Sequence, residues 1–247
     1  MSVPWWKVLA FAIVTALATG LGALPFYFRR QPSRRWLGRA NALASGMMLA
    51  ASFGLIYEGL NVPAGEGRVL LGIVAGLVFI SLTNRWLERH GAVSVAELKG
   101  ADARHALLIF GVMTLHSFTE GVGVGVSFGG GEALGVYIGT AIALHNIPEG
   151  LAISLTMVPK GTPVWKAAGY AILSSLPQPF MALPAFWFVE VFEPFLPVGL
   201  GFAAGAMIWM VFSELLPEAL KEENPQRIAA IITLSVAAMT ILQALLH

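Results

Sequence analysis

The sequence predicts an all-α integral membrane protein, and two features of its composition carry that prediction. Of its 247 residues, 57% are hydrophobic and only 12% are charged, whereas a soluble domain carries about 25% charged residues. The hydrophobic residues also form long continuous runs, and about 20 such residues make a helix that crosses a bilayer. Helix is the expected form because backbone groups in lipid must be hydrogen-bonded within the segment. A β-barrel would instead show short alternating segments.

Eight apolar runs are long enough to be transmembrane helices, and together they predict a single transmembrane domain covering residues 1–247. The first run could be read as a signal peptide. Its apolar stretch is longer than the roughly 7–15 residues of that class, and the arginines after it are typical of a stop-transfer signal. The predicted spans are residues 5–28, 41–60, 69–87, 105–128, 133–158, 164–189, 194–220 and 228–246.

Lys and Arg are distributed unequally between the two sides of these spans. If successive spans alternate in direction, 13 of the 15 basic residues fall on one side, and only Lys7 and Arg68 fall on the other. Because cytoplasmic loops are rich in Lys and Arg, we expect the 13-residue side to be cytoplasmic. Both termini would then lie outside the cytoplasm, with the protein in the cell (inner) membrane.

Charge and cysteine content exclude several other classes of function. The net charge of +1 gives no indication of a nucleic-acid partner, and no cysteine is present. Disulfides, redox motifs and thiolate metal ligands are therefore excluded. Any bound metal must be held by nitrogen, oxygen or thioether ligands.

The pattern His-x-x-x-Glu-Gly occurs twice, at residues 116–121 in the fourth span and 145–150 in the fifth. Positions four apart share one face of a helix, and the connection at roughly residues 129–132 is short enough to make the two helices antiparallel neighbours. Two imidazoles and two carboxylates could then form a tetrahedral site for zinc, or bind iron, manganese, cobalt or nickel. The four candidate ligands are His116, Glu120, His145 and Glu149.

The energetic cost of buried charge strengthens this interpretation. An ionisable side chain at the bilayer centre costs about 2.5–3.5 kcal/mol on insertion scales, and the two spans contain no Lys or Arg to compensate Glu120 and Glu149. A bound dication would supply the counter-charge. The alternative is that the glutamates are protonated or line a water-filled cavity without metal, but the repetition of the His/Glu pair favours a metal.

Prolines indicate where the helices are irregular. Pro148 predicts a bend in the fifth span beside His145, because proline cannot donate a backbone N–H. The run Pro177-Gln178-Pro179 predicts a broken sixth helix near a site. Gln178 could contact an ion or bond to freed backbone carbonyls.

Three further glutamates have two interpretations each. Glu58 is either an entrance ligand or an interfacial residue. Glu214 and Glu218, again four apart, form either an exit relay or a solvated helix end.

The second and seventh spans share a short pattern. Gly46-x-Met48 followed by Phe53 parallels the later Gly-x-Met at residues 205–207 followed by Phe212. Such similarity suits an internal repeat of the transporter type. Met48 itself could offer a thioether to a soft metal or fill the apolar core.

These patterns resemble the ZIP (Zrt/Irt-like protein) family of divalent metal transporters, and the bacterial GufA-like branch looks most similar. Residues 145–150 match the family motif in full, while residues 46–53, 203–207 and 214–218 resemble its second-span and seventh-span patterns. The resemblance implies eight spans in a 3+2+3 arrangement with inverted repeats. It also implies metal import toward the cytoplasm between the fourth and fifth spans, and often a homodimer.

The resemblance also implies roles for single residues. It makes the four His and Glu residues the principal ligands and places Met48 near the entrance. Asn146 and Gln178 fall where some members bind a second ion. Ser117 and Thr119 replace an Asn and a Pro that are common in the fourth-span motif, and Gln178 stands where a glutamate is common.

These departures weaken the second ion site, so we expect a single metal site. A weak second site formed by Asn146, Gln178, Glu120 and Glu149 is the alternative.

The sequence therefore predicts a transporter of divalent cations in a lipid bilayer and not an enzyme. The transported substrate is expected to be Zn²⁺, with Fe²⁺, Mn²⁺, Co²⁺ and Cd²⁺ as alternatives, and no cofactor is expected. One rival is an intramembrane zinc-dependent hydrolase, but its His-Glu-x-x-His motif is absent from the sequence. The other is a ZIP-like membrane protein with degenerate transport.

Overall fold

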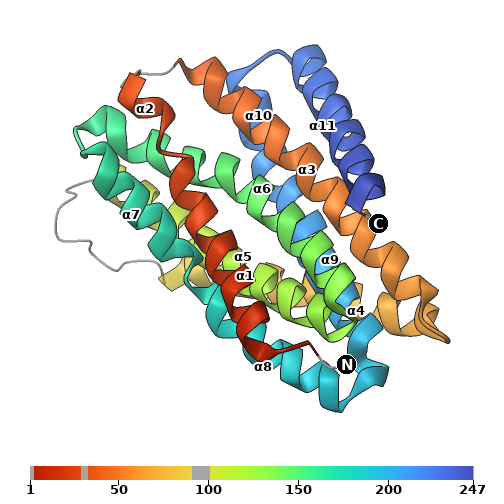
Figure 1. Ribbon diagram of the computed structural model, residues 1–247. Coiled ribbons are helices and arrows are strands. Elements are labelled where there is room, and N and C mark those ends of the chain that lie inside the picture. The colour runs from red at the N-terminus through yellow and green to blue at the C-terminus, as the bar shows by residue number, and fades with distance from the viewer. Residues whose placement is uncertain (1–2, 29–32, 91–100, 247) are drawn as a thin grey trace.

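The computed structural model describes residues 3–28, 33–90 and 101–246, and these residues form a bundle of helices without any β-strand (Figure 1). Arg29, Arg30 and Lys99, which contribute to the predicted orientation, lie outside the described residues. The helices are α1 (Trp5–Leu21), α2 (Pro25–Phe28), α3 (Arg34–Asn61), α4 (Gly65–His90), α5 (Ala101–Gly129), α6 (Glu132–Met157), α7 (Val164–Ser175), α8 (Pro177–Val191), α9 (Leu196–Met210), α10 (Leu216–Glu222) and α11 (Pro225–Leu246). Short 3₁₀ turns η1 (Val158–Lys160) and η2 (Glu193–Phe195) and a π-helical turn η3 (Val211–Leu215) connect some of them.

Each predicted span coincides with one or two of these helices, and the irregular ones are irregular for local reasons. The first span is divided into α1 and α2, and the second helix begins at Pro25. The sixth span is broken between α7 and α8 with Pro177 at the start of α8, where a missing N–H is tolerated. The predicted break in this span is confirmed.

Proline also shapes the seventh and fifth spans, with different results. Pro217 cannot donate a hydrogen bond to the preceding turn. The chain widens there into the π turn η3, and the N–H of Leu216 bonds to the carbonyl of Val211. In the fifth span, α6 continues through Pro148 as a single helix.

Six segments of the described chain are long and apolar enough to cross a membrane. They are Trp5–Phe28, Arg34–Asn61, Gly65–Trp86, Val164–Val191, Glu193–Glu222 and Pro225–Leu245. Helices α5 and α6 are not among the six. In α6 the polar group around His145, Asn146 and Glu149 interrupts the apolar run.

The helices pack in a regular set of pairs around α5 and α6. Helix α6 packs against α1, and α5 packs against α8 (Figure 1). Outside this group α3 packs against α11, α4 packs against α9, and α3 contacts α9. The helices that carry the candidate ligands therefore lie between the other helices.

Glycines bring several of these pairs into backbone contact. A Cβ atom on Gly150 of α6 would lie 1.6 Å from the carbonyl oxygen of Thr19 in α1. A Cβ on Gly121 of α5 would lie 2.5 Å from the carbonyl oxygen of Gln178 in α8. Such small residues allow membrane helices to approach closely, so α1 and α8 are held tightly against the two central helices.

Ion pairs join the terminal turns of helices at the two ends of the bundle. At one end Lys7 Nζ lies 2.8 Å from Glu132 Oε1. At the other, Arg39 Nη2 lies 2.8 Å from Glu223 Oε2, and Arg34 Nη1 lies 3.4 Å from Glu222 Oε1. The loops after the first and seventh spans, which the basic residues assign to one side, therefore do lie together.

Candidate metal site

A tight connection makes α5 and α6 antiparallel neighbours. Helix α5 ends at Gly129 and α6 begins at Glu132, so Gly130 and Gly131 alone connect them. Gly131 has a φ of +131°, a backbone conformation that glycine adopts without a steric penalty. The chain therefore reverses direction within two residues, and the two His/Glu pairs come to face each other.

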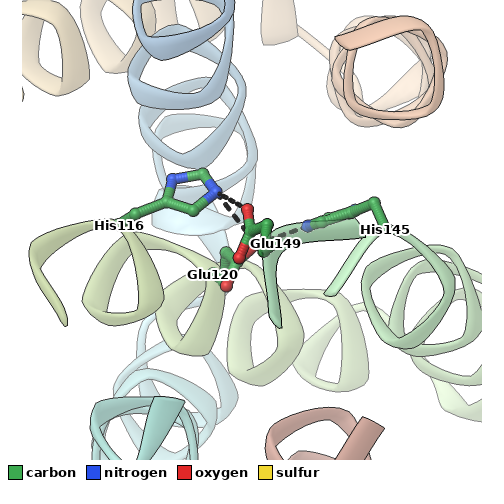
Figure 2. A group of neighbouring side chains, drawn as sticks. All are labelled: His116, Glu120, His145 and Glu149. Atoms are coloured by element: carbon green, nitrogen blue, oxygen red, sulfur yellow. Dashed lines mark hydrogen bonds and ion pairs between the residues drawn. The ribbon is translucent and has the colours of Figure 1, made fainter. Parts of the chain in front are cut away.

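The four candidate ligands meet in the interior of the bundle. His116, Glu120 and His145 are fully buried, and Glu149 is 2% exposed. One ligand atom from each of the four lies within 4.8 Å of the other three. Figure 2 shows the four side chains pointing toward one another from the two helices.

Contacts across the cluster tie each imidazole to the opposite helix. His116 Nε2 lies 2.6 Å from Glu149 Oε1 and 3.1 Å from Glu120 Oε1. His145 Nε2 pairs with the same Glu120 oxygen. Glu120 Oε1 therefore faces both imidazoles, and the cluster combines residues of α5 with residues of α6 instead of forming two separate pairs (Figure 2).

The donor set and its dimensions fit a tetrahedral dication. Zinc binds imidazole nitrogen and carboxylate oxygen at about 2.0–2.2 Å, which places tetrahedral ligand atoms about 3.4 Å apart. The separations in the cluster lie on both sides of that value: His116 Nε2 is 2.6 Å from Glu149 Oε1, and the four ligand atoms all lie within 4.8 Å of one another. Small side-chain adjustments would therefore bring the four atoms around one ion.

Gln178 and Asn146 lie directly beside this cluster. Gln178 Nε2 donates a hydrogen bond to Glu120 Oε2, and Asn146 Nδ2 donates to Gln178 Oε1 at 3.2 Å. Both side chains are fully buried. The structure thus brings the candidate second-site residues next to the first site, with Gln178 bonded to a ligand carboxylate.

Three other residues singled out in the sequence have contacts outside the four-ligand cluster or belong to the apolar core. Met48 is fully buried in the main apolar core. The Thr119 hydroxyl donates a hydrogen bond to the backbone carbonyl of His116 at 2.8 Å. Glu218 pairs at 2.9 Å with the exposed Lys221, which is typical of a solvated helix end.

One polar contact of the site was not predicted from the sequence. Thr15 of α1 is fully buried, and its Oγ1 donates to Gln178 Oε1 at 2.6 Å. A signal for it exists, because Thr15 and Thr19 are four residues apart in an apolar span and therefore share one face. On that face Thr15 contacts Gln178, and Thr19 contacts Ser175.

Comparison with known proteins places the chain in a family. Residues 87–243 match the sequence profile described as ZIP zinc transporter. The chain belongs to the ZIP family. It is 32% identical over 221 residues to the zinc transporter GufA of Myxococcus xanthus, covering 85% of this chain and 87% of GufA. This similarity supports the GufA-like branch.

Two further ZIP relatives extend the comparison. A candidate zinc transporter of Arabidopsis thaliana is 49% identical over 240 residues, which cover 96% of this chain but only 38% of that protein. The zinc transporter ZIPB of Bordetella bronchiseptica is 32% identical over 212 residues, covering 81% of this chain and 69% of ZIPB. ZIP family members are transporters and not enzymes, which argues against the intramembrane hydrolase.

Proposed function

We propose that this chain transports divalent metal ions across a membrane, with Zn²⁺ as the preferred substrate. The observation that carries the proposal is the convergence of two imidazoles and two carboxylates, all at least 98% buried, on one point between α5 and α6. Charged groups are retained inside a membrane bundle only at a high cost. A dication would offset that cost by pairing with both carboxylates.

The ligand set favours zinc over the alternative ions. Zinc accepts tetrahedral nitrogen and oxygen ligands readily, whereas Mn²⁺ and other hard ions favour six oxygen ligands. The relatives described above are also named as zinc transporters. Fe²⁺, Mn²⁺, Co²⁺ and Cd²⁺ are the ions against which selectivity is to be tested.

The packing pairs support eight spans in a 3+2+3 arrangement with inverted repeats. Helices α5 and α6 have 29 and 26 residues, which exceeds the roughly 20 needed to cross a bilayer, so they complete the six apolar spans to eight. If the first three spans correspond to the last three, the contact of α3 with α11 corresponds to that of α9 with α4. The contact of α1 with α6 then corresponds to that of α8 with α5.

The glycines agree with the same correspondence. Gly46 of α3 and Gly205 of α9 are equivalent in the shared Gly-x-Met pattern. A Cβ on Gly46 would lie 2.6 Å from Ile232 O in α11, and a Cβ on Gly205 would lie 2.3 Å from Ile73 O in α4. Equivalent residues therefore make equivalent helix contacts.

We further propose that the protein lies in the cell (inner) membrane, with the loop of Arg39 and Glu223 in the cytoplasm and both termini outside. Metal would move toward the cytoplasm, and the transporter would be a homodimer. The excess of Lys and Arg at one end of the bundle supports the orientation. The ZIP resemblance supports the direction and the homodimer.

Uptake of ⁶⁵Zn into proteoliposomes tests the proposal. Purified protein should give saturable uptake that excess unlabelled Zn²⁺ suppresses, and a panel of the other four ions should compete less well. Reconstituted protein that binds zinc but gives no uptake would support degenerate transport. Turnover of a hydrolase substrate without flux would support the enzyme.

A further inference from the structure

Next to the metal cluster lies a second layer of buried polar groups, formed by Thr15, Asn146 and Gln178. We propose that Thr15 of α1 is a positioning residue, which acts through the Gln178 amide to fix Glu120 for binding a single ion. The inference rests on the proposed function, because it concerns the same site. It assigns a part in metal binding to α1, a helix that supplies none of the four ligands.

The hydrogen-bond polarity of this layer has one consistent solution. The backbone carbonyl of Thr15 can only accept, so Asn146 must direct its Nδ2 toward it, at 2.8 Å. That same Nδ2 lies 3.2 Å from Gln178 Oε1, so the Gln178 amide must direct its oxygen toward Asn146. The Gln178 nitrogen is then left to face Glu120.

Thr15 fixes the same amide a second time through its hydroxyl. Its Oγ1 lies 2.6 Å from Gln178 Oε1 and 2.8 Å from the carbonyl oxygen of Ala12. Both contacted oxygens are acceptors, so the single hydroxyl proton of Thr15 is shared between them, and the shorter of the two hydrogen bonds goes to Gln178. Both the hydroxyl and the backbone of Thr15 therefore oppose rotation of the amide.

As a result, the two carboxylate oxygens of Glu120 have different partners. Oε2 accepts the hydrogen bond from Gln178, while Oε1 faces His116 and His145. A carboxylate held in this way offers one oxygen to an ion placed among the imidazoles. The amide N–H also occupies the side of Glu120 where a second cation would need an oxygen, so the layer favours one ion over two.

The packing of the layer explains why it can act as a rigid support. Thr15, Asn146, Gln178 and Glu120 are all fully buried, so water does not compete for these bonds. Gly121 places the Gln178 backbone directly against α5, and Gly150 places α1 directly against α6. Residues that hydrogen-bond to a metal ligand and so orient it typically contribute to metal binding, and their removal lowers metal affinity about 10- to 100-fold.

The test compares two isosteric substitutions, Thr15→Val and Thr19→Val. Thr19 is an equally buried hydroxyl one turn away, but it pairs with Ser175 at 2.7 Å and not with Gln178, so it controls for hydroxyl loss in α1. Isothermal titration of purified protein with Zn²⁺ should show about three- to tenfold weaker binding for Thr15→Val, in line with one hydrogen bond. Thr19→Val should bind as wild type, and Thr15→Ser should restore the affinity.

A double-mutant cycle with Gln178→Leu identifies the route of the effect. If Thr15 acts through Gln178, Thr15→Val should weaken zinc binding in the wild-type protein but cause no further loss in Gln178→Leu. Additive losses would overturn the inference. So would a Thr15→Val variant whose folded yield falls while its folded fraction binds zinc normally, because that result describes structural support alone.

These outcomes are separable from failure of the proposed function. Wild-type protein that neither binds nor transports zinc would refute the metal site itself. Wild-type binding and uptake with an unchanged Thr15→Val affinity would leave the transporter intact and refute only the role of Thr15.

Discussion

Replacing Glu149 by Gln is the most direct test of the cluster. The substitution keeps the shape of the side chain and removes one of the two carboxylate charges. Glu149 is 2% exposed, and its Oε1 lies 2.6 Å from His116 Nε2. Water therefore cannot substitute for the lost carboxylate, and the His116 imidazole faces a neutral amide in place of a negative charge.

The expected magnitude follows from the cost of breaking a buried charge pair. Removal of one partner of such a pair costs about 3–5 kcal/mol, and each 1.4 kcal/mol corresponds to about tenfold in affinity. We therefore expect Glu149→Gln to weaken zinc binding by roughly 10² to 4 × 10³-fold. Glu149→Ala, which removes the amide oxygen as well, should abolish uptake while the protein still inserts into the membrane.

Titration calorimetry and ⁶⁵Zn uptake into proteoliposomes measure the two effects. Glu132→Gln is the matched control, because Glu132 is a half-exposed glutamate paired with Lys7 at the end of the bundle. A solvent-exposed ion pair contributes only about 0–1 kcal/mol, so this variant should bind zinc as wild type. Folded Glu149→Gln protein with wild-type affinity and uptake would show that the cluster does not hold the transported ion.

Three other substitutions test separate features of the structure. Gln178→Glu replaces the amide by a second carboxylate beside Glu120 and should raise the zinc stoichiometry measured by calorimetry from one to two; unchanged stoichiometry and affinity would count against this. Gly150→Ala places a Cβ 1.6 Å from a backbone oxygen of α1 and should lower thermal stability by about 1–3 kcal/mol, whereas Gly169→Ala, which meets nothing within 4 Å, should not. The backbone N–H of Asn224 and the guanidinium of Arg39 lower the pKa of Glu223. The contribution of Glu223 to the stability of the fold is therefore present above about pH 4.3, the ordinary glutamate pKa, and is lost as the pH falls through the lowered pKa. The difference in unfolding temperature between Glu223→Gln and wild type should accordingly be largest near neutral pH and disappear in acid; a difference that persists in acid would contradict this assignment.

The helical spans were predictable because their apolar runs are continuous, but their ends were not. Helix α3, which contains the second predicted span, begins at Arg34, seven residues before the predicted residue 41, because a helix continues past the lipid as far as its backbone bonds allow. The break before Pro177 was predicted, since two prolines two residues apart leave few intrahelical bonds. The π turn beside Pro217 was not predicted, although the proline that causes it was visible.

The candidate ligands were predictable because both the spacing and the short connection act locally. A separation of four residues puts His116 and Glu120 on one face, and two glycines between α5 and α6 then bring the second pair opposite. The structure brings the four side chains together as this spacing predicts. Their binding of a transported ion stays a prediction, as does the entrance role of Met48.

The support behind Glu120 could not be predicted in the same way. Thr15 and Gln178 are 163 residues apart, and periodicity within a span says only that Thr15 shares a face with Thr19. Which turn of α1 meets Gln178 is decided by backbone contacts between helices, above all by Gly150 against Thr19. A displacement of α1 by one turn, about 5.4 Å, would put Thr19 in the place of Thr15. Either threonine could donate the same hydrogen bond. The register of α1 against α6, set by the contact of Gly150 with Thr19, therefore determines which of the two supports the metal site.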